Sequence, residues 1–143
     1  KLISCVFSRR ERKADTMQDQ PTAYELIDIV AEFIRVHAMP QMTGHAAFHA
    51  LVAANALDIV KRELAIAPKA SAEEAVRLQN LLGHDATLDE MNRELCTRIE
   101  NGELTLDTPG LADHLWAITM TKLAIDQPKY SGYVRALEEE GQS

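Results

Sequence analysis

Apolar side chains dominate one stretch of the chain, residues 43–68, whose centre reads AFHALVAANALDIVKREL. Between residues 46 and 57 the only polar side chains are His49 and Asn55. A helix that is apolar on nearly all sides is usually buried inside a helical domain. The pattern therefore predicts that this stretch is a central, buried helix against which the other helices pack.

A second helix is predicted just before it, because Thr22 can serve as N-cap and Glu25 completes a capping box three residues later. This helix should run to about Met39 and stop before Pro40. His37 falls within its apolar arc, where a histidine is more often a hydrogen-bonded core residue than a metal ligand.

Capping and breaking residues divide the rest of the chain into shorter helices. Pro68 is expected to end the central helix, and a capping box formed by Ser71 and Glu74 is expected to start the next one. The alternation in ELTLDTPG is too short to form a sheet alone. The pattern thus predicts an all-α fold, a compact bundle of five or six helices. Beyond the central helix, helices are expected over residues 71–82, 87–100, 108–126 and 130–139.

Composition and charge exclude several classes of protein. The net charge of −7 would repel a phosphate backbone, so no nucleic-acid partner is expected. The longest apolar runs are far shorter than the roughly 20 residues of a membrane span, so no membrane partner is expected either. Cys5 and Cys96 form neither a disulfide framework nor a zinc motif, which favours a cytoplasmic location.

The first sixteen residues differ from the remainder in charge. They hold five basic and two acidic residues, a net +3 that leaves −10 for the rest of the chain. We expect residues 1–16 to be a non-native or disordered leader and residues 17–143 to be a single helical domain. LISC, at residues 2–5, resembles a lipoprotein cleavage box but follows no apolar run, and the basic cluster at residues 9–13 is a weak indication of a nucleic-acid arm.

Candidate metal and catalytic residues are sparse. His45 and His49 have the i, i+4 spacing with which two imidazoles can share a metal on a helix. A hydrolytic zinc motif would require a glutamate directly after the first histidine, and Ala46 stands there. We therefore predict no metal, no cofactor and no catalytic residues.

A polar strip on the central helix is the best candidate for ligand binding. Asn55, Asp58 and Arg62 share one side, and Asp58 can pair with Arg62 one turn later. Such a strip is more often solvated or interhelical than a ligand site. Lys122 lies on an otherwise apolar arc, where pairing with Asp126 is a simpler explanation than catalysis. The ligand-binding candidates are His49, Asn55, Asp58, Arg62 and Lys122.

Four segments together resemble a bacterial family of unknown function over residues 17–133, namely MQDQPTAYELIDIVAEFI, FHALVAANALDIVKREL, LDEMNRELCTRI and LAIDQPKYSGY. Members of that family are small proteins often encoded beside an acyl-CoA dehydrogenase and an aminoglycoside-phosphotransferase-like kinase. The resemblance implies an accessory role near acyl-CoA metabolism and supplies no catalytic residues. The chain is itself too short for an acyl-CoA dehydrogenase and has no flavin-binding pattern.

Two functional hypotheses follow. The first is a non-enzymatic accessory protein that binds an acyl-CoA dehydrogenase-like or phosphotransferase-like enzyme. The second is a small-molecule binder or enzyme with a pocket between the second and fifth predicted helices, polar at Asn55, Asp58 and Arg62. The sequence does not predict the oligomeric state.

Overall fold

The computed structural model describes residues 20–141, and within that range the chain folds into five α-helices and no strand. The prediction of an all-α bundle of five or six helices is confirmed. A π-helical turn (Ile34–Ala38) and a 3-10 turn (Met39–Gln41) connect the first two helices. The α-helices are α1 (Ala23–Phe33), α2 (Gly44–Leu82), α3 (Leu88–Glu100), α4 (Leu111–Asp126) and α5 (Ser131–Glu140).

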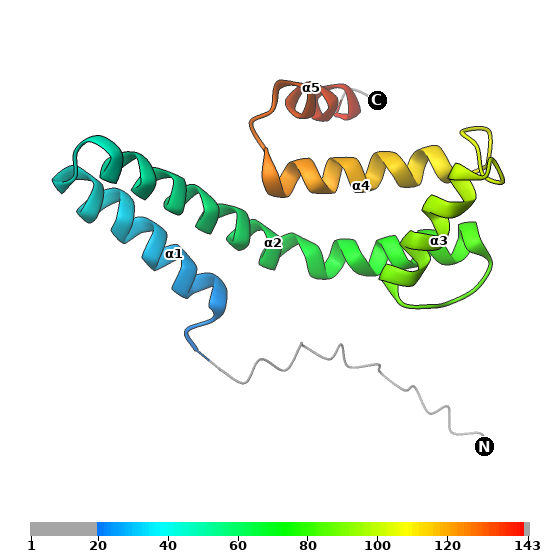
Figure 1. The fold of residues 1–143 in the computed structure, drawn as a ribbon, viewed down its shortest axis with the longest axis horizontal. Helices are drawn as coiled ribbons and strands as arrows, with labels where there is room; N and C mark the ends of the chain where they lie inside the picture. Colours follow the sequence, from blue (N-terminus) through cyan, green and yellow to red (C-terminus); the bar gives the residue numbers. More distant parts are fainter. Residues whose placement is uncertain (1–19, 142–143) are drawn as a thin grey trace, which may run out of the picture.

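The 39-residue helix α2 runs the length of the molecule and organises it (Figure 1). Helix α1 lies antiparallel to the first half of α2, and the two form what we call the α1–α2 hairpin. Helix α3 packs on the far end of α2, α4 returns along its second half, and α5 lies against α4. The molecule therefore has two parts, the α1–α2 hairpin at one end and the packed helices α3, α4 and α5 at the other, and α2 runs through both.

The hydrophobic core lies at the second end, where α2, α3 and α4 meet. Its α3 members, Met91 and Leu95, are spaced i, i+4 and so lie on one face of that helix. The side chains around them come from α2 and from the first turn of α4. The buried residues of this cluster are Leu78, Leu82, Met91, Leu95 and Leu111.

The predicted burial of the central helix is wrong for its first half. In the described part of the α1–α2 hairpin the only buried residues are Ala31 and Ala54, both small. Phe48 is 61% exposed, and His49 and Asn55 are exposed as well. An apolar pattern predicts that a helix gains stability when its surface is covered. In the hairpin only two helices pack together, so each covers one side of the other and the remaining sides stay exposed.

Pro68 does not end the central helix, and the separate helix predicted from Ser71 does not exist. Helix α2 continues through Pro68 to Leu82. A proline in a helix interior loses one backbone hydrogen bond, at a cost of about 3 kcal/mol. Packing of α3 and α4 against the second half of α2 offsets that cost.

Most of the other predicted helix boundaries differ from the structure by a few residues at most, and those set by capping boxes agree best. A capping box starts α1 at Thr22, as predicted, and a second one at Thr87 starts α3 where the helix over residues 87–100 was expected. Helix α4 begins after Gly110, whose φ of 85° lies in the left-handed region, rather than at Thr108. The α-helical part of α1 ends at Phe33 instead of near residue 39.

The π-helical turn that follows α1 places His37 on the surface, so the expectation of a core histidine is wrong. The predicted leader, residues 1–16, lies outside the described residues. None of the helices in the described range combines the length and apolarity that crossing a membrane requires.

Candidate functional site

An open cleft of about 500 Å³ lies between α2 and the segment that connects α4 to α5. Its α2 wall comes from four residues at i, i+3, i+4 and i+7 spacing, which share one side of the helix. Its other wall is the end of α4 and the connection that turns at Pro128. The lining residues are Asn55, Asp58, Ile59, Arg62, Asp126, Gln127, Pro128, Lys129 and Tyr130.

The structure brings three of the five candidate ligand residues together and leaves two apart. Asn55, Asp58 and Arg62 line the cleft. His49 lies near the start of α2, where its ring stacks on His45 with 6.4 Å between centroids. Lys122 is exposed on α4, and the described residues include no ion pair between it and Asp126.

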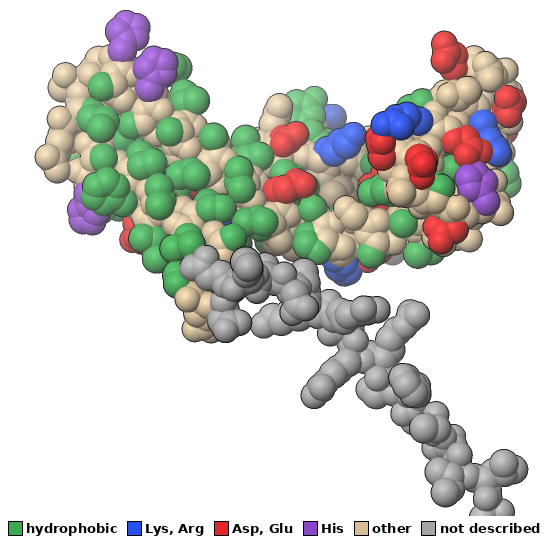
Figure 2. Space-filling model, turned by 60° about the horizontal axis from the view of Figure 1, so that its bottom comes forward, with side chains coloured by type: hydrophobic (Ala, Val, Ile, Leu, Met, Phe, Trp, Pro, Cys, Tyr) green, Lys and Arg blue, Asp and Glu red, His purple; other side chains and the backbone are tan. Residues whose placement is uncertain are grey.

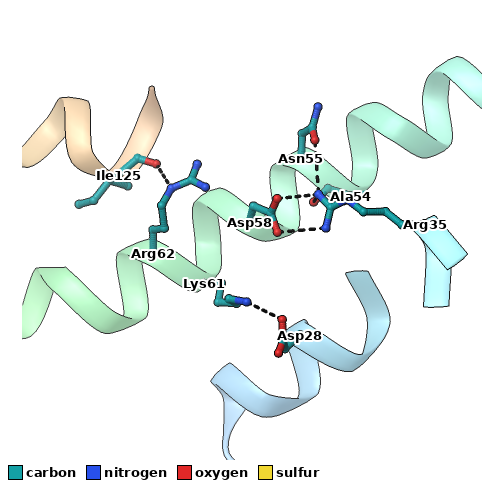
Figure 3. A network of polar contacts seen from close by, with 8 residues as sticks. All are labelled: Asp28, Arg35, Ala54, Asn55, Asp58, Lys61, Arg62 and Ile125. Carbon is teal, nitrogen blue, oxygen red and sulfur yellow. Dashed lines mark hydrogen bonds and ion pairs between the residues drawn. The ribbon is translucent and has the colours of Figure 1, made fainter. Parts of the chain in front are cut away.

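Asp58 pairs with Arg35 of the π-helical turn, so the predicted pair between Asp58 and Arg62 is wrong. The guanidinium donates to both carboxylate oxygens of Asp58, at 2.6 and 3.2 Å (Figure 3). The same group donates to the backbone oxygen of Ala54 at 3.0 Å and reaches the Asn55 side-chain oxygen at 3.4 Å. Arg35 thus fixes the connection after α1 against α2 and neutralises the carboxylate at the cleft.

Arg62 points the other way, toward α4. Its Nε donates to the backbone oxygen of Ile125 at 2.5 Å (Figure 3). That oxygen belongs to the last turn of α4, where carbonyl groups lack helical partners. The bond ties α2 to α4 and holds the guanidinium at the rim of the cleft.

A second pair joins the helices of the hairpin. Lys61 of α2 donates to the carboxylate of Asp28 of α1, and its ammonium lies 5.2 Å from the centroid of the Tyr24 ring. The bond to Asp28 raises the pKa of Lys61. Neither Lys61 nor Asp28 lines the cleft, so this pair orients α1 on α2.

The buried His114 of α4 is a polar group that the sequence reading did not single out. It is fully buried, and neither ring nitrogen has a hydrogen-bond partner among the described residues. Burial lowers its pKa, and the nearby Arg77 charge lowers it further, although Glu74 acts in the opposite direction. The imidazole is therefore held neutral inside the fold.

A protein family described as a domain of unknown function, DUF6285, matches residues 40–130. The chain belongs to this family. The DUF6285 region begins just before α2 and ends at Tyr130, so it contains every residue that lines the cleft, whereas α1 lies outside it. Searches of curated proteins and of solved structures find no match.

Sequence reasoning missed the partner of Asp58 and one wall of the cleft. Arg35 lies on a different element from Asp58, and only the fold brings the two together. The connection from Gln127 to Tyr130 lies between the helices predicted at residues 108–126 and 130–139, and Pro128 is the local signal for the turn that places it beside α2. Within residues 20–141 no group of three or more potential metal ligands converges.

Proposed function

We propose that the chain is a non-enzymatic interaction protein and that α1, with the turn after it, binds a protein partner. The observation that carries the proposal is an exposed row of large apolar side chains, which we call the α1 stripe. Its members are 40–60% exposed. The α1 stripe consists of Leu26, Ile29, Val30, Phe33 and Val36.

The spacing of the α1 stripe places it on the side of α1 that faces away from α2. Leu26, Ile29 and Phe33 are related by i+3 and i+7, so they lie along one face. Ala31, the one buried residue of α1, lies on the opposite face. The one fully buried residue of α1 is therefore a small one, whereas four large apolar residues of α1 and Val36 of the following turn face outward.

The α1 stripe is large enough to stabilise a complex. Full burial of an aliphatic or aromatic side chain contributes about 1.5–3 kcal/mol, so five half-exposed ones could contribute on the order of 5 kcal/mol on contact. Contiguous exposed apolar patches of this kind mark protein-interaction surfaces. In Figure 2 hydrophobic side chains gather over the α1–α2 hairpin, and charged side chains gather over the opposite end.

The resemblance to proteins encoded beside an acyl-CoA dehydrogenase-like and a phosphotransferase-like enzyme supports one of these enzymes as the partner. The first half of α2 adds an uncharged surface to this end of the molecule, because residues 45–57 carry no formal charge. Helix α1 itself carries Glu25, Asp28 and Glu32, and Asp28 is paired with Lys61.

The test is a binding measurement between the full chain and each purified enzyme, by size-exclusion chromatography with light scattering. We expect a complex with one enzyme, and at least about tenfold weaker binding by Ile29→Asp and Phe33→Asp, because a carboxylate in an apolar interface is costly. Leu106→Asp is the matched control, since Leu106 is 74% exposed but lies in the α3–α4 loop.

Three outcomes would contradict the proposal: no binding to either enzyme, undiminished binding by the two α1 variants, or an equal loss with Leu106→Asp. A homodimer that the α1 variants disrupt, in the absence of any enzyme complex, would also contradict it and would assign the α1 stripe to self-association.

A further inference from the structure

We infer that the cleft between α2 and the α4–α5 connection binds a small oxyanion, a phosphate or carboxylate group of a small molecule. This inference goes beyond the proposed function, because the cleft and the α1 stripe share no residue. It depends on which charges at the cleft are already paired and which are free to meet a ligand.

The charges around the cleft sum to a small local excess of positive charge. Asp58 is already neutralised by Arg35, at 2.6 Å. The remaining charged side chains in the lining are Arg62, Lys129 and Asp126, two cations against one anion. In a chain with a net charge of −7, such a basic depression attracts anions that the rest of the surface repels.

The cleft also offers hydrogen-bond donors without partners. Arg62 uses Nε to bind the backbone oxygen of Ile125, and within residues 20–141 its two terminal nitrogens make no hydrogen bond, so they are available in a fixed orientation. In the described part of the chain, the Lys129 ammonium and the Tyr130 hydroxyl make no hydrogen bond. Arginine with its planar fork is suited to paired oxygens of carboxylate or phosphate, and an arginine already oriented loses less entropy on binding.

The size of the cleft fits a small ligand. Its volume of about 500 Å³ lies within the range of small-molecule sites, roughly 300–1,000 Å³. Ile59 adds an apolar surface between the polar walls. The carboxylate of Asp126 repels an anion in the cleft, so neutralising Asp126 should strengthen oxyanion binding. Neutralising Arg62 or Lys129 should have the opposite effect and weaken it.

The experiment is a titration of the ¹⁵N-labelled full chain, followed by NMR. The probes are inorganic phosphate and acetate, with chloride at matched ionic strength as the reference. We expect saturable shifts at cleft residues with phosphate, acetate or both, and the tighter of the two names the preferred group. Lys129→Gln and Arg62→Gln should weaken binding about tenfold, and Asp126→Asn should strengthen it severalfold.

Lys122→Gln is the matched control, because Lys122 lies on α4, is exposed, and does not line the cleft. It should bind the probe as the wild type does. Lys129→Gln keeps the test decisive if Arg62→Gln perturbs the α2–α4 contact, since Lys129 makes no hydrogen bond within the described residues.

Shifts that rise linearly without saturation would overturn the inference, and so would shifts that are centred outside the cleft. An equal loss of binding with Lys122→Gln and Lys129→Gln, or weaker binding by Asp126→Asn, would overturn it as well. None of these outcomes bears on the α1 stripe, so the inference and the proposed function can fail separately.

Discussion

Arg35→Gln tests whether one side chain holds the α1–α2 hairpin together. Arg35 makes a two-pronged contact with Asp58 and donates to the backbone oxygen of Ala54 at 3.0 Å. These hydrogen bonds link the π-helical turn to α2. Removing the guanidinium should therefore destabilise the hairpin, where large buried side chains are missing, more than it would destabilise the core at the other end.

The expected magnitude follows from the exposure of the pair. A hydrogen bond to a charged group contributes about 1.5–3 kcal/mol, whereas a fully exposed ion pair contributes about 0–1 kcal/mol. The side chains of Arg35 and Asp58 are 35% and 33% exposed, which places the pair between these limits. We expect Arg35→Gln to lower the free energy of unfolding by about 2 kcal/mol.

The assay is urea denaturation followed by circular dichroism, with a double-mutant cycle that adds Asp58→Asn. The matched control is Arg93→Gln, which removes an i, i+4 pair with Asp89 whose side chains are 73% and 70% exposed. This control should cost less than about 0.5 kcal/mol. Equal losses from Arg35→Gln and Arg93→Gln, or no coupling between Arg35 and Asp58, would refute the reasoning.

Three further predictions concern the core and α2. Leu78→Ala, at a fully buried position, should lower the free energy of unfolding by about 3–5 kcal/mol in urea melts, and a loss below 1 kcal/mol would contradict the assigned core. Pro68→Ala should raise stability by about 1–3 kcal/mol, because it restores a helical hydrogen bond; a lower melting temperature would contradict a continuous α2. The His114 pKa is lowered from 6.5 by burial, so protonation favours the unfolded chain and stability should fall as pH drops below about 6.5. His114→Phe should reduce that pH dependence, and an unchanged slope in melts between pH 7.5 and 5.5 would exclude His114 as its source.

The sequence predicted where helices start when the start depends on side chains only a few residues away. The capping boxes at Thr22 and Thr87 act over three residues, and both start helices in the structure. Pro68 and Ser71 gave equally clear local signals, but packing along the second half of α2 overrides them. Helix α2 tolerates the hydrogen bond lost at Pro68 because other helices pack against it on both sides of the proline. Helix α1 packs on its first half, and α3 and α4 pack on its second half.

Of the two walls of the cleft, only the one on α2 could be predicted from the sequence. Helical spacing alone placed Asn55, Asp58 and Arg62 on one side of α2, and these three line the cleft. The pairing of Asp58 was not predictable, because the sequence favours the residue one turn away and the fold supplies Arg35 from 23 positions earlier. The α4–α5 connection forms the other wall of the cleft because α4 packs back along α2, a tertiary contact that local sequence does not reveal.

Burial was the least predictable property. The apolar residues around Phe48 indicated a core helix, and the structure leaves much of that surface exposed. Periodicity identifies side chains that gain from being covered, but it does not identify what covers them. For the α1 stripe, we propose that the cover is a protein partner.

The most direct measurement of that claim is hydrogen exchange of the full chain, alone and saturated with the enzyme that it binds. The account predicts slower exchange across residues 26–36, which contain the α1 stripe, and little change in α3. Protection confined to α3, α4 and α5, with exchange in α1 unchanged, would contradict it.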